Sequence, residues 1–197
     1  MALRVVEQAG LTDVGRQREA NEDNLVLAEP VFAVADGMGG ARAGEVASRV
    51  AAETFRDARD PAETPERQLA AVVRAANRRI YDLAQSDESR RGMGTTLTAT
   101  MVAGDAVSIG HVGDSRAYRL RGAKLEQLTR DHSLVEEMRR KGQLTEAQAE
   151  DHPQRSIITR ALGPEPEVEV DLQTVPAKPG DVFLICSDGL TTMLDDE

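Results

Sequence analysis

The chain has 197 residues, enough for one domain with a sizeable core, and its formal charge is −10. This acidic balance, together with the absence of tryptophan and the scarcity of other aromatic residues, argues against nucleic acid as a partner. No stretch approaches the ~20 apolar residues needed to cross a bilayer, no signal peptide is recognisable, and the single cysteine, Cys186, excludes an internal disulfide. We therefore expect a cytoplasmic protein that does not contact a membrane.

The first part of the chain predicts strands. Apolar runs bounded by turn signals place them at residues 3–9, 24–28 and 31–35. The last of these runs is apolar throughout, which is typical of a strand buried on both faces. It is expected to pair with residues 24–28 across the turn at Glu29-Pro30.

Two helices are expected next. Over residues 43–58, apolar or small side chains recur at helical spacing, so one face of this helix should pack on the sheet. The second helix begins at Thr64, a good N-cap residue that is followed by Pro65 in the first turn, and its apolar stripe reaches Leu83. Both helices are interpreted as scaffolding of the core.

From Thr95 the hydrophobic period changes to two, which is typical of strands. The expected strands cover residues 95–101, 106–112 and 115–120. Turn signals at Gly104 and Gly122 favour an antiparallel meander.

Residues 131–163 form a polar, mostly helical insertion, in which capping boxes begin at Ser133 and Thr145. Strands return at residues 168–175 and 182–186. Because strand runs alternate with helix runs and no linker interrupts them, the pattern indicates a single α+β domain over residues 1–197.

Three aspartates lie where an apolar run ends, and each is flanked by Gly or Ser: Asp36, Asp114 and Asp188. A single aspartate in this position is usually a turn residue, and for Asp114 taken alone the two interpretations are equally open. Three of them suggest a carboxylate cluster for a hard cation such as Mg²⁺ or Mn²⁺. The glycine-rich residues 36–40 could instead cradle a phosphate, but no Gly-Lys-Ser/Thr follows and Asp36 would repel an anion.

Six motifs follow one another along the chain: REANED at residues 18–23, ADGMGG at 35–40, GE at 44–45, GMGTT at 92–96, GHVGDSR at 110–116 and SDG at 187–189. Their order resembles that of the bacterial metal-dependent serine/threonine protein phosphatases, the type 2C or PPM family. The resemblance extends from about Thr12 to the last residue. It implies an antiparallel β-sandwich with α-helices packed on both outer faces, in α-β-β-α layers.

The resemblance also implies a metal site with two main ions, Mn²⁺ or Mg²⁺, and a third ion that is held more weakly. Asp36 then bridges the two main ions, and Gly37 supplies its carbonyl oxygen. Asp188 binds one of these ions and the third one, and Asp114 is the other carboxylate of the third site.

Three further residues receive roles from the resemblance. Glu22 and Asp23 hold metal-bound waters, and Asp23 orients the attacking one; by themselves the two acids would be read as a solvated strand entrance. Arg18 binds the substrate phosphate, a role that suits a planar bidentate donor, whereas Arg16 is a nearby arginine without a role.

The chain departs from the family pattern in two places. Some members place a histidine after the first Asp-Gly or after the Gly-Gly, where this chain has Met38 and Ala41, so a metal-bound water is expected to protonate the leaving group. The family also continues past the Ser-Asp-Gly motif to a final strand whose aspartate completes the site, whereas this chain ends at residues 194–197. We expect a catalytic domain that is incomplete at its C-terminus, because a missing core strand leaves unpaired sheet edges; a partner chain or a swapped segment is the alternative.

These observations predict a metal-dependent phosphatase that hydrolyses phosphoserine and phosphothreonine with an activated water. Its partners would be phosphorylated proteins and a serine/threonine kinase, and residues 131–163 would form a flap beside the site. The alternatives are a catalytically impaired fragment or a non-catalytic metal-binding interaction module of the same fold. An aspartyl phosphotransferase would need an Asp-x-Asp pair at Asp36, where Gly37-Met38 follows instead.

Overall fold

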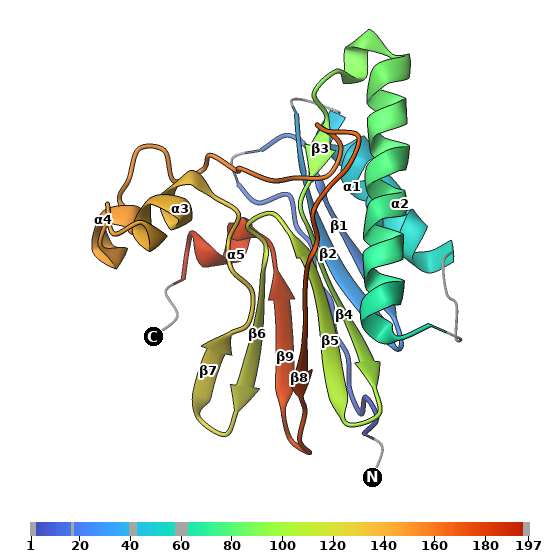
Figure 1. Ribbon diagram of the computed structural model, residues 1–197, viewed down its shortest axis with the longest axis vertical. Helices are drawn as coiled ribbons and strands as arrows, with labels where there is room; N and C mark the ends of the chain where they lie inside the picture. Colours follow the sequence, from blue (N-terminus) through green and yellow to red (C-terminus); the bar gives the residue numbers. More distant parts are fainter. Residues whose placement is uncertain (1–2, 17, 40–42, 58–62, 195–197) are drawn as a thin grey trace.

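Two antiparallel sheets form the centre of the protein in the computed structural model, which describes residues 3–16, 18–39, 43–57 and 63–194 (Figure 1). The larger sheet has the strand order β1-β2-β4-β5-β8, and β3 also pairs with β2. Its strands are β1 (Asp23–Ala28), β2 (Val31–Met38), β3 (Gly94–Thr95), β4 (Leu97–Ala103), β5 (Ala106–Val112) and β8 (Asp171–Pro176). The smaller sheet has the order β7-β6-β9, with β6 (Arg116–Arg121), β7 (Lys124–Gln127) and β9 (Val182–Cys186).

Helices α1 (Ala43–Asp57) and α2 (Pro65–Ser86) pack on the outer face of the larger sheet (Figure 1). The Thr64 hydroxyl accepts a hydrogen bond from the backbone N–H of Arg67, as its predicted capping role requires. Both predicted helices are therefore confirmed. The remaining helices are short: a 3₁₀ turn (Glu88–Arg90), α3 (Leu134–Arg140), α4 (Glu146–Glu150) and α5 (Asp188–Thr191). None of the helices in the described ranges is long and apolar enough to span a membrane.

Two apolar cores hold these layers together. The main core lies between the two long helices and the larger sheet, and includes the fully buried Leu69 and Ile80 of α2 and Leu97 of β4. The second core lies between the sheets and joins Ile109 of β5 to Ala117 of β6, with Phe183 of β9 packed against them. The α+β class and the sandwich of antiparallel sheets are confirmed, and burial of side chains between the layers is what stabilises them.

Several apolar side chains of the smaller sheet are exposed. Leu120 lies opposite both Leu125 and Val182 in the strand pairing, and all three are exposed, as is Leu184. Directly opposed residues share one face of a sheet, so these side chains form an apolar strip on that face.

Two predicted details are wrong. Residues 3–9 do not form a strand, and the backbone N–H of Leu3 donates to the carbonyl of Gly104 without a ladder following. An alternating sequence forms a stable strand only if it pairs with another strand and buries one face. This segment buries no such face at Val6, which is 85% exposed. The strands of the expected meander do not share one sheet either, because β6 leaves β5 and pairs with β7 and β9. The change of sheet occurs at Gly113, whose φ of +111° favours glycine.

Candidate metal centre

The β1–β2 hairpin places Asp23 directly opposite Asp36 at the end away from its turn. The neighbouring strands hold the backbone of Asp36 in place. Its N–H donates to the Thr96 hydroxyl at 3.0 Å, and its carbonyl accepts from the Thr96 N–H and the Thr95 hydroxyl, both at 2.8 Å. The β2 strand therefore presents the Asp36 carboxylate from a backbone that is bonded to β3 and β4.

The end of β9 meets this hairpin from the other sheet. The Ser187 hydroxyl donates to the Asp23 carboxylate at 2.7 Å, although the two residues are 164 positions apart. Asp188 follows as the first residue of α5, and its side chain lies close enough to that of Asp36 to raise the pKa of Asp36. Asp114, in the link from β5 to β6, interacts electrostatically with both. The structure thus brings all four predicted aspartates into one interacting group.

Burial and mutual repulsion work against ionisation of these carboxyls. Burial is the largest cause that raises the pKa of Asp36 to about 9, followed by the charges of Asp23 and Asp188. Burial also raises the pKa of Asp114 to about 6, with contributions from Asp188 and Asp131. Buried carboxylates that repel one another need protons or a cation, and a divalent cation would stabilise all of them in the ionised form.

The donor atoms of this group fit Mg²⁺ or Mn²⁺, because hard cations take carboxylate and carbonyl oxygens. Gly37 adds a backbone constraint: a Cβ at this position would lie 2.2 Å from the carbonyl oxygen of Gly44 at the start of α1, so only glycine allows the approach. Across the described ranges, no three Asp, Glu, His or Cys side chains converge as a finished ligand cage. The group is therefore a set of neighbouring carboxylates of the right chemistry rather than a closed metal site.

Glu22 and Arg18 lie at the rim of this group. The Glu22 side chain is 14% exposed, and its backbone carbonyl accepts from the Gly37 N–H at 3.2 Å and from the Ser48 hydroxyl at 2.5 Å. The Arg18 side chain is 64% exposed, and its guanidinium lies 3.0 Å from the Glu22 carboxylate. Arg18 is thus a solvent-accessible cation that is tethered beside the carboxylates.

Several residues that position the group were not identified from the sequence. Ser187 orients Asp23, and Thr95 and Thr96, the last two residues of the GMGTT motif, hold Asp36. Arg116 donates three hydrogen bonds to Asp131, at 2.8, 3.0 and 3.1 Å. The signal that could have identified the threonines was their place in the GMGTT motif at residues 92–96.

His111 is a hydrogen-bonded core residue. Its Nε2 lies 2.8 Å from the carbonyl of Arg130, its Nδ1 lies 2.9 Å from the Thr98 hydroxyl, and the residue is 2% exposed. Burial, and then the charge of His132, lower the pKa of His111 to about 4. His111 is therefore neutral at physiological pH.

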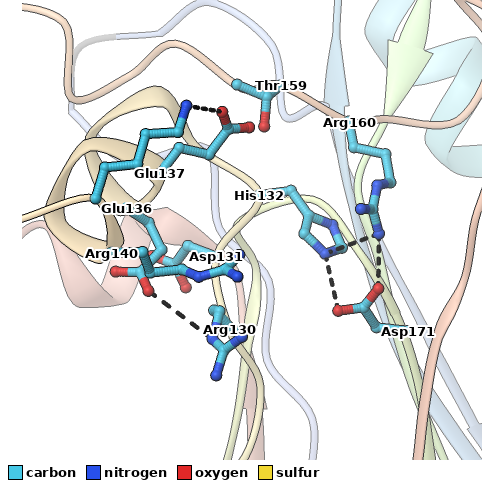
Figure 2. Close-up of a pocket in the computed structure, with 10 residues that line it drawn as sticks. Arg130, Asp131, His132, Glu136, Glu137, Arg140, Thr159, Arg160 and Asp171 are labelled. Atoms are coloured by element: carbon cyan, nitrogen blue, oxygen red, sulfur yellow. Dashed lines mark hydrogen bonds and ion pairs between the residues drawn. The ribbon is translucent and has the colours of Figure 1, made fainter.

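Residues 131–163 lie beside the group and border a cavity of about 290 Å³. Figure 2 shows this cavity with α3 side chains such as Glu136 and Arg140 on one side and Arg160 and Asp171 on the other. Cations and anions alternate around it, with ion pairs from Lys141 to Glu137 and from Arg160 to Asp171. Its wall is charged but close to neutral in sum.

Known proteins share both the sequence and the fold. The sequence profile of the protein phosphatase 2C family matches residues 16–197. The serine/threonine phosphatase stp of Listeria monocytogenes is 45% identical over 194 residues, which covers 93% of this chain and 77% of that protein. The crystal structure of the Mycobacterium tuberculosis serine/threonine phosphatase PstP/Ppp has a TM-score of 0.88 at 41% identity and covers 93% of this chain and 79% of that one.

A structure of the catalytic domain of PstP in complex with two manganese ions has a TM-score of 0.85 at 38% identity, and the match covers 93% of this chain and 78% of that one. The profile match spans most of this chain, and the relatives match it over most of their own length. The chain therefore belongs to the protein phosphatase 2C family of metal-dependent serine/threonine protein phosphatases.

Proposed function

We propose that this chain removes phosphate from phosphoserine and phosphothreonine side chains with divalent ions, Mn²⁺ or Mg²⁺, held at the aspartate group. The observation that carries the proposal is the placement of Asp23 opposite Asp36, with Asp188 near enough to Asp36 to raise its pKa. Asp36 and Asp188, together with the Gly37 carbonyl, would hold two ions. Asp114 and Asp188 would hold a third, more weakly bound ion. The ions would lower the pKa of a water molecule so that it attacks phosphorus near neutral pH.

The protein residues would orient the reactants. Asp23 is held by the Ser187 hydroxyl, so its carboxylate can accept a proton from the attacking water in a defined direction. Glu22 would accept a hydrogen bond from a second water. Arg18 would exchange part of its contact with Glu22 for two hydrogen bonds to the phosphate oxygens, where a planar guanidinium stabilises the charge of the transferring group.

The substrates would be phosphorylated proteins, and a serine/threonine kinase would act in the opposite direction in the cytoplasm. Residues 131–163 are our candidate for a flap that sets substrate preference, because they border the charged cavity next to Asp131. An exchange of this segment for that of a related phosphatase should change the ranking of phosphopeptide substrates. An unchanged ranking would contradict the flap.

The test is hydrolysis of a phosphothreonine peptide by the 197-residue chain with added Mn²⁺, with Asp36→Ala as the control variant and metal content measured on the same samples. Mn²⁺-dependent turnover that is lost in the variant is the expected result. Full activity in Asp36→Ala would overturn the assignment of the site. Mn²⁺ binding without hydrolysis would instead support a non-catalytic metal-binding module.

A further inference from the structure

His132 and Gly113 exchange two hydrogen bonds. The backbone N–H of His132 donates to the Gly113 carbonyl at 2.7 Å, and the Gly113 N–H donates to His132 Nδ1 at 3.0 Å. His132 is only 8% exposed. Gly113 also packs closely against Thr96, since a Cβ on it would lie 2.6 Å from the Thr96 side chain. The residue before Asp114 is therefore held by one histidine.

This contact determines which ring nitrogen of His132 carries the proton. A backbone N–H can only donate, so Nδ1 must accept, and the proton of the neutral ring lies on Nε2. His132 Nε2 is 3.2 Å from the Asp171 carboxylate and 3.1 Å from Arg160 Nη1, and Arg160 donates to the other oxygen of that carboxylate at 2.6 Å (Figure 2). The imidazole ring thus connects Gly113 to Asp171 at the start of β8.

Both ends of the segment 131–163 form hydrogen bonds with residues next to the aspartate group. His132 lies at its first end, and the Thr159 N–H donates to the His132 carbonyl at 2.8 Å. At its other end, Leu162 and Thr95 exchange backbone hydrogen bonds of 2.9 and 3.0 Å. The Thr95 hydroxyl in turn donates to the Asp36 carbonyl. A change in the conformation of this segment would therefore act on the backbone at Gly113 and at Thr95.

We propose that His132 is a positioning residue that couples the conformation of residues 131–163 to the affinity of Asp114 for a divalent cation. The bond from Gly113 to Nδ1 fixes the direction of the Asp114 loop, and the contact of Nε2 with Asp171 connects the ring to β8. Such a coupling is reciprocal, so a cation bound at Asp114 would also favour the ordered arrangement of the segment. This inference rests on the proposed function, because it takes Asp114 to be a metal ligand.

Two variants separate the two bonds of the ring. In His132→Asn the side-chain oxygen replaces Nδ1 and can still accept from Gly113, but the contact with Asp171 is lost. In His132→Gln the side-chain amide reaches toward Asp171, but the acceptor for Gly113 is lost. His152, a histidine of the same segment that accepts from the Gln154 N–H at 3.2 Å, provides the control His152→Gln.

The measurements are Mn²⁺ binding by calorimetry, hydrogen exchange of the Gly113 amide by NMR, and KM and kcat for a phosphothreonine peptide. We expect His132→Gln to weaken Mn²⁺ binding ~10-fold, as is usual when a group that orients a metal ligand is lost, and to speed the exchange of the Gly113 amide. His132→Asn should leave Mn²⁺ affinity and amide exchange close to those of the unmodified protein, and should raise KM for the peptide. His152→Gln should change none of these values.

Equal effects of His132→Gln and His132→Asn on Mn²⁺ affinity, or no effect of either, would overturn the coupling and leave His132 with a packing role. If His132→Gln does not fold, Asp171→Asn tests the same chain of contacts, because it leaves the Gly113 bonds intact. It should raise KM without weakening Mn²⁺ binding, and weakened binding would contradict the inference. A chain that hydrolyses no phosphopeptide would refute the proposed function, while calorimetry and amide exchange would still decide the role of His132.

Discussion

Asp23 and Asp36 lie directly opposite each other in the β1–β2 ladder, at the end where β9 also terminates. Like charges at opposed positions of an antiparallel pair destabilise the sheet, and this pair is also partly buried. The hairpin therefore contains a repulsion between two carboxylates that lowers the stability of the metal-free fold. A bound cation would neutralise this repulsion, and functional sites often lower the stability of the folded state in this way.

The repulsion predicts that Asp36→Asn stabilises the metal-free protein. The pKa of Asp36 is about 9 in the folded chain against 3.8 for a free carboxyl, so the folded state retains a proton that the unfolded state releases. The contribution of Asp36 to stability is thus complete below pH ~4 and declines as the pH rises toward 9. At pH 8 without metal, we expect Asp36→Asn to raise the free energy of unfolding by ~1–3 kcal/mol.

Urea unfolding at pH 5 and pH 8 in the presence of a chelator would measure this effect, and the difference between the two proteins should be larger at pH 8. Added Mn²⁺ should stabilise the unmodified protein and have little effect on the variant. A variant that is less stable than the unmodified protein at pH 8 would show that Asp36 is paired in a way that the ladder register does not explain.

Arg18 should contribute to substrate binding and Arg16 should not. Both side chains belong to exposed residues of the same loop, but only Arg18 is tethered to Glu22. We expect Arg18→Ala to raise KM for a phosphopeptide ~10-fold or more, because a charge-assisted bidentate contact with phosphate is lost. Steady-state kinetics of Arg18→Ala and Arg16→Ala at saturating Mn²⁺ provide the comparison. Equal effects would mean that only the net charge of the loop matters.

Gly37→Ala should destabilise the protein strongly. The new methyl group would lie 2.2 Å from the Gly44 carbonyl oxygen and 2.7 Å from the Glu22 carbonyl oxygen, so β2 and the start of α1 would have to separate. We expect a loss of ~2 kcal/mol or more, as for other overpacked backbone contacts. Gly189→Ala is the control, because its nearest neighbour would be at the ordinary distance of 3.6 Å. Thermal unfolding of both variants would decide, and similar melting temperatures would contradict the close approach.

Asp181 should stabilise the turn before β9 in a pH-dependent way. Two hydrogen bonds from Arg121, at 2.6 and 2.7 Å, are the main cause that lowers the pKa of Asp181 to about 2, and the Lys178 N–H adds a third at 2.8 Å. A lowered folded-state pKa means that the stabilisation is complete above ~4 and is lost as the pH falls toward 2. Asp181→Asn should cost ~1–2 kcal/mol at pH 7 and progressively less below pH 4. Urea unfolding from pH 7 to pH 3 would measure this, and a cost that does not change with pH would exclude the ion pair as its source.

Local patterns in the sequence predicted local structure well. Thr64 and Pro65 specified the start of α2, and the period of two specified β4 and β5, because capping and alternation act between residues that are close in the chain. The wrong strand at residues 3–9 and the single-sheet meander have a different origin. A strand needs a partner, and the choice of partner sheet depends on contacts that alternation does not encode.

For the candidate site, too, some features follow from the sequence and others only from the tertiary structure. The sequence by itself determined the family, through six ordered motifs, and the chemical type of the ligand group, since carboxylates at strand ends favour a hard cation. Only the tertiary structure decided that Ser187 reaches Asp23, that Asp188 reaches Asp36 and that His132 holds Gly113. These contacts join segments that meet through the packing of two sheets, and the pKa values they create depend on burial, which no local pattern specifies.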